Sequence, residues 1–396
     1  MARFPLAMST WDEREIAALH GVIDSDRYTM GAQVQRFERR FADHVGARHA
    51  VMVNSGSSAN LLMIAALTFT SDAGRVLRRG DVVVVPAVSW STTYAPLQQH
   101  GLRVRFVDVD EHTLNFDLDA LDAAMTDDVR LVMAVNLLGN PNDFGEVRRL
   151  ADRAGALLVE DNCESLGARY GGQQTGTFGL MGSYSGFFSH HISTMEGGVI
   201  VTDDDELLHL LLSLRAHGWT RDLPAENHLA SPPVGDPMHD SFRFVLPGYN
   251  VRPLEMSGAV GLAQLDKLDG FIAGRRRNAD AVRAAVGEHP LVQLQRETGE
   301  SSWFGFSLLR RPDAPVTRAQ LASALVEAGF EVRPIVAGDF TRTEVIGHFD
   351  HDPIGPLPGA ARVHEDGLFI GNHHVPMDDA VMALRVCLDD LLGNAS

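Results

Sequence analysis

Two adjacent histidines, His190 and His191, stand in a short polar turn between two apolar stretches of the chain. The turn begins at Ser185 and ends in a Gly-Gly pair, and residues 199–202 then have the β-branched character of a strand. An imidazole with a pKa of about 6.5 can take a proton from one group and deliver it to another. A metal site is the alternative, but two histidines lack the third and fourth ligands. Acid–base chemistry is therefore favoured for this turn, and no metal is expected.

Primary amines are almost absent from the chain, which contains one lysine, Lys267, against 33 arginines. Arginine cannot replace lysine in a Schiff base, because its guanidinium group is not deprotonated in proteins. Lys267 lies in a predicted helix with Asp266 and Asp269 beside it, and we expect it to be solvated. The sequence therefore predicts that any carbonyl-bearing cofactor is held without a covalent link to lysine.

Polar or aromatic residues follow three predicted strands, at places where a ligand could bind. Residues 54–60 (Asn-Ser-Gly-Ser-Ser-Ala-Asn) lead from a strand into a helix. Such a turn either offers backbone N–H groups to a phosphate or is a plain connection. Trp90 follows the apolar strand 81–86 and could stack on a flat ligand or belong to the core. Asp161 ends another apolar run, where it could meet a cationic group or cap a helix. Both interpretations stay open at each position.

Strands and helices alternate through most of the chain, which predicts an α/β domain with a mostly parallel sheet and ligands at the carboxyl ends of the strands. Strands are expected at 49–53, 81–86, 103–108, 129–136 and 156–161, and helices at 12–24, 31–45, 118–126, 144–154 and 203–221. A loop at 222–240 and a helix from 254 through 267 to 286 follow.

The C-terminal part of the chain has the pattern of a smaller α+β domain. Its predicted strands are 302–309 and 331–334, and its predicted helices are 318–328 and 378–392. We therefore divide the chain into a large domain with N-terminal helices, residues 1–265, and a small C-terminal domain, residues 266–396.

Composition excludes several classes of function. The formal net charge of −18 argues against a nucleic-acid partner, because phosphates require a basic face. No apolar run is long enough to span a membrane, and the first residues lack the core of a signal peptide, so the cytoplasm is expected. Only Cys163 and Cys387 are present, which excludes a disulfide framework, a cysteine-rich zinc site and a four-cysteine iron–sulfur cluster.

In order and spacing, these segments resemble the DegT/StrS-type sugar aminotransferase family, whose members are fold-type I pyridoxal phosphate (PLP) enzymes. The resemblance covers nearly the whole chain. It implies eight cofactor-binding residues, namely Gly56, Ser57, Ser58, Trp90, Asp161, Glu164, Ser185 and Asn250.

The same resemblance implies a role for each of these residues. The glycine and serines would bind the cofactor phosphate, and Trp90 would stack on the pyridine ring. Asp161 would pair with the ring nitrogen, and Glu164 would lie beside the phenolic oxygen. Asn250, in a Gly-Tyr-Asn segment, would reach the phosphate in the neighbouring subunit, so a homodimer with shared active sites is expected.

His190 stands where that family has its Schiff-base lysine. A histidine there, followed by His191 and Ile192, is similar to the GDP-4-keto-6-deoxymannose 3-dehydratase-like branch, which deoxygenates C3 of nucleotide-linked 4-keto-6-deoxy sugars. Residues 333–342 also resemble that branch, whereas residues 369–374 depart from it. The resemblance implies His190 as catalytic acid–base, non-covalent PLP or pyridoxamine phosphate (PMP), and an amino-acid donor such as glutamate. The scarcity of cysteine selects a form without an iron–sulfur cluster.

Two other functions are compatible with the sequence. A nucleotide-sugar aminotransferase could hold its cofactor non-covalently and use the histidine as base, in which case its product would keep the C3 hydroxyl. A non-catalytic, cofactor-binding regulatory protein could also have lost the lysine. Retention of the other cofactor-site residues argues against that last hypothesis, because an inactive site need not keep them.

Overall fold

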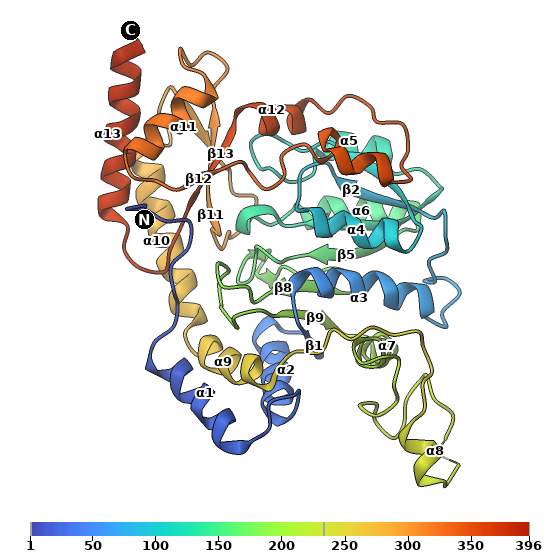
Figure 1. Cartoon of the computed structure of the whole chain (residues 1–396). Coiled ribbons are helices and arrows are strands. Elements are labelled where there is room, and N and C mark those ends of the chain that lie inside the picture. Colours follow the sequence, from blue (N-terminus) through green and yellow to red (C-terminus); the bar gives the residue numbers. More distant parts are fainter. Residues whose placement is uncertain (1, 233, 396) are drawn as a thin grey trace.

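A seven-stranded sheet forms the centre of the computed structural model, which describes residues 2–232 and 234–395 (Figure 1). The strand order is β1-β9-β8-β5-β4-β2-β3; the last five run parallel, whereas β9 is antiparallel to both of its neighbours. The strands are β1 (His49–Val53), β2 (Val82–Pro86), β3 (Arg103–Val107), β4 (Val129–Val135), β5 (Leu157–Asp161), β8 (Gly182–Ser185) and β9 (Gly198–Thr202). Because the parallel strands point the same way, their carboxyl ends meet at one edge.

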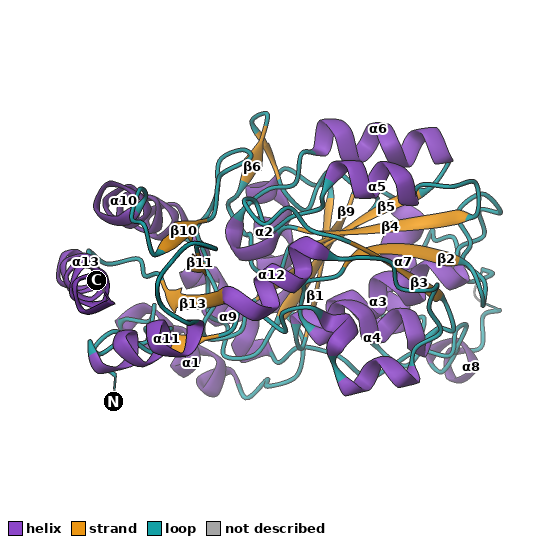
Figure 2. Ribbon diagram, turned by 90° about the horizontal axis from the view of Figure 1, so that it is seen from above, coloured by secondary structure: helices purple, strands orange, loops and turns teal. Residues whose placement is uncertain are grey.

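Helices cover both faces of this sheet, with α3 and α4 on one side and α5 and α6 on the other (Figure 2). The first layer consists of α3 (Gly56–Phe69), α4 (Ser91–Gln99) and α7 (Asp205–Arg215), and the second of α5 (Leu118–Ala124) and α6 (Phe144–Ala154). Strand β2 is buried along its whole length, which explains its unbroken apolar sequence.

A second, antiparallel sheet lies in the C-terminal part of the chain, in the order β10-β11-β13-β12. It comprises β10 (Val292–Leu294), β11 (Gly305–Arg310), β12 (Val332–Arg333) and β13 (Gly367–Gly371). Its core is shared with α10 (Leu268–Val286), α11 (Arg318–Glu327) and α13 (Asp378–Ala395).

One segment projects from the body of the molecule, whereas α2 packs against β1 and β9 in a core cluster of its own. Residues 217–232 and 234–250 form an arm whose short helix α8 lies far from both sheets (Figure 1). The remaining elements are α1 (Glu13–Ser25), α2 (Ala32–Val45), α8 (Pro237–Ser241), α9 (Glu255–Leu265), α12 (Pro358–Asp366), the hairpin strands β6 (Arg169–Tyr170) and β7 (Gln173–Gln174), and the 3-10 turns η1 (Leu137–Gly139), η2 (Phe340–Arg342) and η3 (Glu344–His348). No helix of the described residues is both long and apolar enough to cross a bilayer.

The predicted fold class is confirmed, with three local corrections. The helix expected at 203–221 ends at Arg215, because the chain turns at His217 and Gly218, which both have positive φ. The helix expected at 254–286 is interrupted between α9 and α10, and the loop expected at 222–240 contains most of α8. The proposed boundary at residue 265 stays a prediction.

Candidate functional site

The predicted site residues converge at the carboxyl edge of the parallel strands. Asp161 is the last residue of β5 and Ser185 the last of β8, while Trp90 follows β2 and precedes α4. The turn that opens α3 contacts Ser185. Side chains far apart in sequence are thus gathered where α/β proteins bind their ligands.

The turn at Gly56 is packed so closely that only glycine fits. A Cβ atom on Gly56 would lie 2.8 Å from both the Sγ of Cys163 and the Cβ of Ser185. Helix α3 starts there because the Ser55 side chain accepts a hydrogen bond from the Ser58 backbone N–H at 3.1 Å. Backbone N–H groups at a helix start, with hydroxyl groups around them, can bind a phosphate.

Trp90 is 59% exposed, so the alternative that placed it in the core is wrong. The start of its helix is tied to the Gly56 turn, because the Ser57 and Thr92 hydroxyl groups lie 2.8 Å apart. An exposed indole beside a turn of this kind can stack on a flat ring if the phosphate of that ligand binds at the turn.

Asp161 is nearly buried, and three groups fix its carboxylate. Asn60 Nδ2 and Thr93 Oγ1 each donate to Oδ2 at 2.7 Å, and the Cys163 backbone N–H donates to Oδ1 at 3.2 Å. No described helix begins at Asp161, so the helix-cap alternative is wrong. Sequence reasoning missed Asn60 and Thr93, although Asn60 is a polar residue at the start of an apolar helix. The arrangement keeps a buried carboxylate oriented for a cationic or N–H partner.

Glu164 lies in the turn after Asp161 and accepts a hydrogen bond from the Leu138 backbone N–H at 3.0 Å. Burial raises the pKa of Glu164 to about 7, and the charge of Asp161 adds to this effect. A carboxyl group with such a pKa can donate a hydrogen bond at neutral pH as well as accept one.

His190 and His191 point into different surroundings. The His190 ring is partly buried, with its centroid 5.0 Å from that of Phe304 and 6.0 Å from that of Phe187. Desolvation lowers the pKa of His190 to about 4, and the charge of Arg275 acts in the same direction. His191 is 1% exposed, and its Nε2 lies 3.1 Å from the Ser302 carbonyl oxygen. Only His190 therefore retains solvent access. Among the described residues, no group of three histidine, cysteine or acidic side chains could hold a metal ion.

Asn250 lies at the base of the arm. Its backbone pairs with Ala216, and its Oδ1 accepts a hydrogen bond from Arg252 Nε at 3.1 Å. Among the described residues, no hydrogen bond joins the Asn250 side chain to the Gly56 turn or to Ser185 of the same chain. Contacts at the edge of the sheet therefore link the Gly56 turn to Ser185 and to the start of α4, and the start of α4 to Asp161. His190 lies in the loop that follows Ser185, and Asn250 lies outside this cluster.

Lys267 is not solvated, contrary to prediction. Its side chain is 8% exposed and its Nζ lies 2.6 Å from Glu15 Oε1, in a side chain with no exposure. Nζ also donates to the Thr10 carbonyl oxygen at 2.8 Å. The neighbouring aspartates misled the prediction, because the residues that bury Lys267 come from the N-terminal segment.

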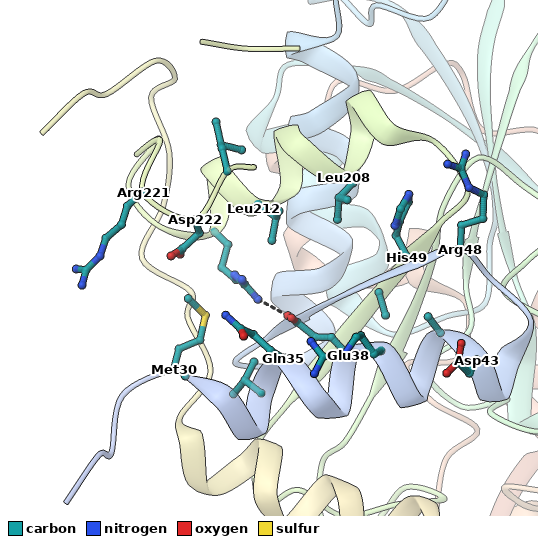
Figure 3. Close-up of a pocket in the computed structure, with 17 residues that line it drawn as sticks. Met30, Gln35, Glu38, Asp43, Arg48, His49, Leu208, Leu212, Arg221 and Asp222 are labelled. Carbon is teal, nitrogen blue, oxygen red and sulfur yellow. Dashed lines mark hydrogen bonds and ion pairs between the residues drawn. The ribbon is translucent and has the colours of Figure 1, made fainter. Parts of the chain in front are cut away.

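A cavity of about 640 Å³ lies elsewhere, between α2, β1 and α7 (Figure 3). Its wall contains a buried ion pair in which Arg215 Nη1 lies 2.5 Å from Glu38 Oε1. Neither His190 nor any of the eight predicted cofactor residues lines this cavity.

A known family shares this arrangement of sequence and fold. The profile of the DegT/DnrJ/EryC1/StrS aminotransferase family matches residues 9–384. The chain belongs to that family. A GDP-4-keto-6-deoxy-D-mannose 3-dehydratase of Yersinia pseudotuberculosis is 54% identical over 385 residues, covering 97% of this chain and 98% of the relative.

Solved structures of family members agree with this relationship. The Escherichia coli GDP-4-keto-6-deoxy-D-mannose 3-dehydratase with bound hydrated PLP is 52% identical, with a TM-score of 0.96 over 98% of this chain and all of that one. A GDP-4-keto-6-deoxymannose 3-dehydratase with a trapped PLP–glutamate geminal diamine has a TM-score of 0.95 at the same identity and the same coverage of both chains. The family and the histidine-containing branch expected from the sequence are both confirmed.

Proposed function

We propose that this chain is a PLP/PMP-dependent 3-dehydratase that removes the C3 hydroxyl of a GDP-linked 4-keto-6-deoxy sugar, with glutamate as amino donor. One observation carries the proposal. The loop that carries His190 begins at Ser185 of the proposed cofactor cradle, while the only lysine of the chain is ion-paired with Glu15. The nucleotide and sugar come from the similarity to the Yersinia and Escherichia coli enzymes.

The shape and polarity of the cradle fit PLP or PMP. The close approach of Gly56 to Ser185 leaves the start of α3 free for a phosphate, which Ser57, Ser58 and Ser185 would also contact. The exposed face of Trp90 suits a pyridine ring. The oriented Asp161 carboxylate suits the ring nitrogen, and Glu164 can donate to the phenolic oxygen, since burial raises its pKa to about 7. When bound, PMP would supply an amine for the sugar ketone and an electron sink for C3 deoxygenation.

His190 would move the proton in this reaction. Its lowered pKa keeps the ring neutral at physiological pH, so it can accept a proton at the cofactor carbon beside the sugar. The imidazolium formed is then acidic enough to protonate the C3 oxygen as that group leaves. No lysine amine competes for the cofactor, because Lys267 is held against Glu15. This absence favours loss of the hydroxyl over completed amino transfer.

A homodimer would complete the site. The arm exposes several large apolar side chains, including Met238 at 75%, Phe242 at 62% and Phe244 at 59%. The ring of Trp219 stacks between the last two. Apolar surface of this kind marks an interaction site, and a second copy whose Asn250 reaches the phosphate fits both the arm and the family resemblance. Analytical ultracentrifugation tests this idea, and a fully active monomer would contradict it. The cytoplasmic location stays a prediction.

The decisive experiment replaces His190. His190→Asn should bind PLP as the wild type does, because the phosphate, stacking and pyridine contacts lie elsewhere. Its turnover of GDP-4-keto-6-deoxymannose with glutamate should fall about 10²–10⁴-fold, the usual contribution of a positioned acid–base group. His191→Asn is the matched control and should lose less activity, since that ring faces the Ser302 carbonyl group.

Mass spectrometry of the products separates the candidate functions. A 3-deoxy-4-keto sugar is expected. A stable amino sugar that keeps its C3 hydroxyl would identify an aminotransferase, and failure to bind either cofactor would support the non-catalytic alternative. Equal losses in the two histidine variants would remove His190 from its proposed role.

A further inference from the structure

Arg275, on α10, is a buried guanidinium group without a carboxylate partner among the described residues. It is 4% exposed, and its Nη1 donates to the carbonyl oxygens of Phe304 and Asn372, both at 2.9 Å. Its Nε makes no hydrogen bond to the described residues, and burial alone lowers its pKa to about 10. An uncompensated buried charge is costly, so its presence calls for a structural or functional reason.

The segment that Arg275 holds has a strained backbone. Trp303 has a φ of 49°, in the left-handed region that non-glycine residues rarely adopt. Asn372 Nδ2 donates to the Trp303 carbonyl oxygen at 2.9 Å and to the Arg275 carbonyl oxygen at 3.1 Å. On the other side, the Phe304 backbone N–H donates to the Leu138 carbonyl oxygen at 3.1 Å. Segments from three parts of the chain therefore fix this short stretch in place.

The same segment supports the two histidines. The Phe304 ring contacts both imidazoles, with centroid separations of 5.0 Å to His190 and 5.9 Å to His191. The carbonyl oxygen of Ser302 lies 3.1 Å from His191 Nε2. Phe304 is thus in contact with the His190 ring through its side chain and with Arg275 through its carbonyl group.

We propose that Arg275 is a positioning residue for His190: it clamps the Trp303–Phe304 segment against the imidazole and places an unpaired positive charge behind it. The inference rests on the proposed role of His190 as proton carrier. Arg275 acts through its neighbours, because its guanidinium group is 4% exposed and donates to backbone carbonyl groups. A nearby positive charge disfavours the imidazolium, so the proton-accepting form of His190 is retained as the pH falls.

The charges around His190 support this role. Arg275 on α10 and His191 on the same loop are the titratable groups that interact with it, whereas Phe187, Phe304 and Ser189 provide uncharged surroundings. Desolvation and then Arg275 lower the pKa of His190 to about 4.

Three other histidines show the same pattern. In His191, His373 and His374, desolvation lowers the pKa first, and the charge of Arg275 is the next cause. In the described part of the chain no carboxylate pairs with the guanidinium, so its charge acts on all of these rings.

The test measures the His190 pKa directly, by deuterium exchange at the imidazole C2–H in cofactor-free protein, with fragmentation mass spectrometry to separate His190 from His191. In the wild type the exchange rate of His190 should change well below pH 6.5. Arg275→Gln should raise this midpoint by about one pH unit, because a like charge has been removed. The acid limb of the kcat/KM profile should move upward by a similar amount.

Arg276→Gln is the matched control. Arg276 is the next residue on α10 and also donates to backbone carbonyl groups, but Glu300 lies 3.5 Å from its guanidinium. Its replacement should leave the His190 midpoint within experimental error of the wild type. Arg275→Lys keeps the positive charge and should keep the midpoint low, with a reduced kcat from the weaker clamp.

Two results would overturn the inference. One is a wild-type His190 midpoint at or above 6.5, which needs no variant and so holds even if Arg275→Gln fails to fold. The other is a folded Arg275→Gln protein with an unchanged midpoint. Both measurements use protein without cofactor or substrate, so they stay interpretable if the proposed dehydratase activity is absent.

Discussion

Two buried cations lie about two helical turns apart near the start of α10, and their surroundings differ. Lys267 meets the buried carboxylate of Glu15 at 2.6 Å and the half-exposed Asp12 at 3.3 Å. Arg275 meets only backbone carbonyl groups among the described residues. The first charge is neutralised by its partners, whereas the second is not.

The difference separates a structural charge from one that acts on its neighbours. The Lys267 pair ties the N-terminal segment to the α9–α10 junction, and the Lys267 charge contributes to the lowered pKa of His374 only after desolvation and Arg275. Desolvation lowers the pKa of four histidines, including His190, and the charge of Arg275 lowers each of them further. The same contrast holds for buried acids. Burial opposes the ionisation of Glu15, but hydrogen bonds from the Asp12 backbone N–H and then from Lys267 outweigh it and lower the pKa, whereas desolvation raises the pKa of Glu164.

Breaking the paired charge should have the largest effect on stability. Lys267→Met leaves Glu15 buried without a counter-charge, which should reduce the free energy of unfolding by about 3–5 kcal/mol. Urea unfolding at pH 7 measures this loss, and PLP affinity should be unchanged because the site lies elsewhere. Lys267→Met combined with Glu15→Gln should recover a large part of the loss. A single variant as stable as the wild type would show that the pair does not stabilise the fold.

Replacing Glu164, which has no counter-charge among the described residues, should change the free energy of unfolding by a smaller amount that depends on pH. The pKa of Glu164 is about 7 in the folded protein, against 4.5 for a solvent-exposed glutamate such as that of the unfolded chain. Between these values the folded chain keeps a proton that the unfolded chain loses, so stability is lost as the pH rises towards 7. Glu164→Gln should therefore stabilise the cofactor-free protein by about 1–3 kcal/mol at pH 8 and by much less at pH 4.5. Thermal unfolding at both pH values tests this, and a gain that is larger at the acid value would contradict it.

The smallest expected signal is that of PLP attached covalently to Lys267. Because Lys267 is ion-paired and 8% exposed, borohydride reduction of the PLP-loaded protein should attach no cofactor to it. Peptide mass spectrometry detects such attachment. Cofactor found on Lys267 would mean that its pairing with Glu15 opens readily, and would weaken the contrast with Arg275.

The sequence predicted the parts of the site that follow local patterns. Asp161 and Ser185 end apolar strands, and the Gly56 turn opens a helix, so their convergence follows from the direction of parallel strands. Arg275 could not be found in this way, because one arginine among 33 looks like any other until Phe304 and Asn372 close around it. Lys267 was misplaced for the same reason, since Glu15 reaches it from a helix at the other end of the chain.

The ion pairs of the only lysine also affect how accurately the stoichiometry of cofactor binding can be measured. Free PLP is an aldehyde that condenses with accessible side-chain amines, which blurs an absorbance titration in a lysine-rich protein. Here the single ε-amine is engaged by two carboxylates and a carbonyl oxygen. Adducts of PLP with side-chain amines should therefore contribute little to the absorbance. A titration of this protein with PLP should reach a sharp end point at the number of specific cofactor sites.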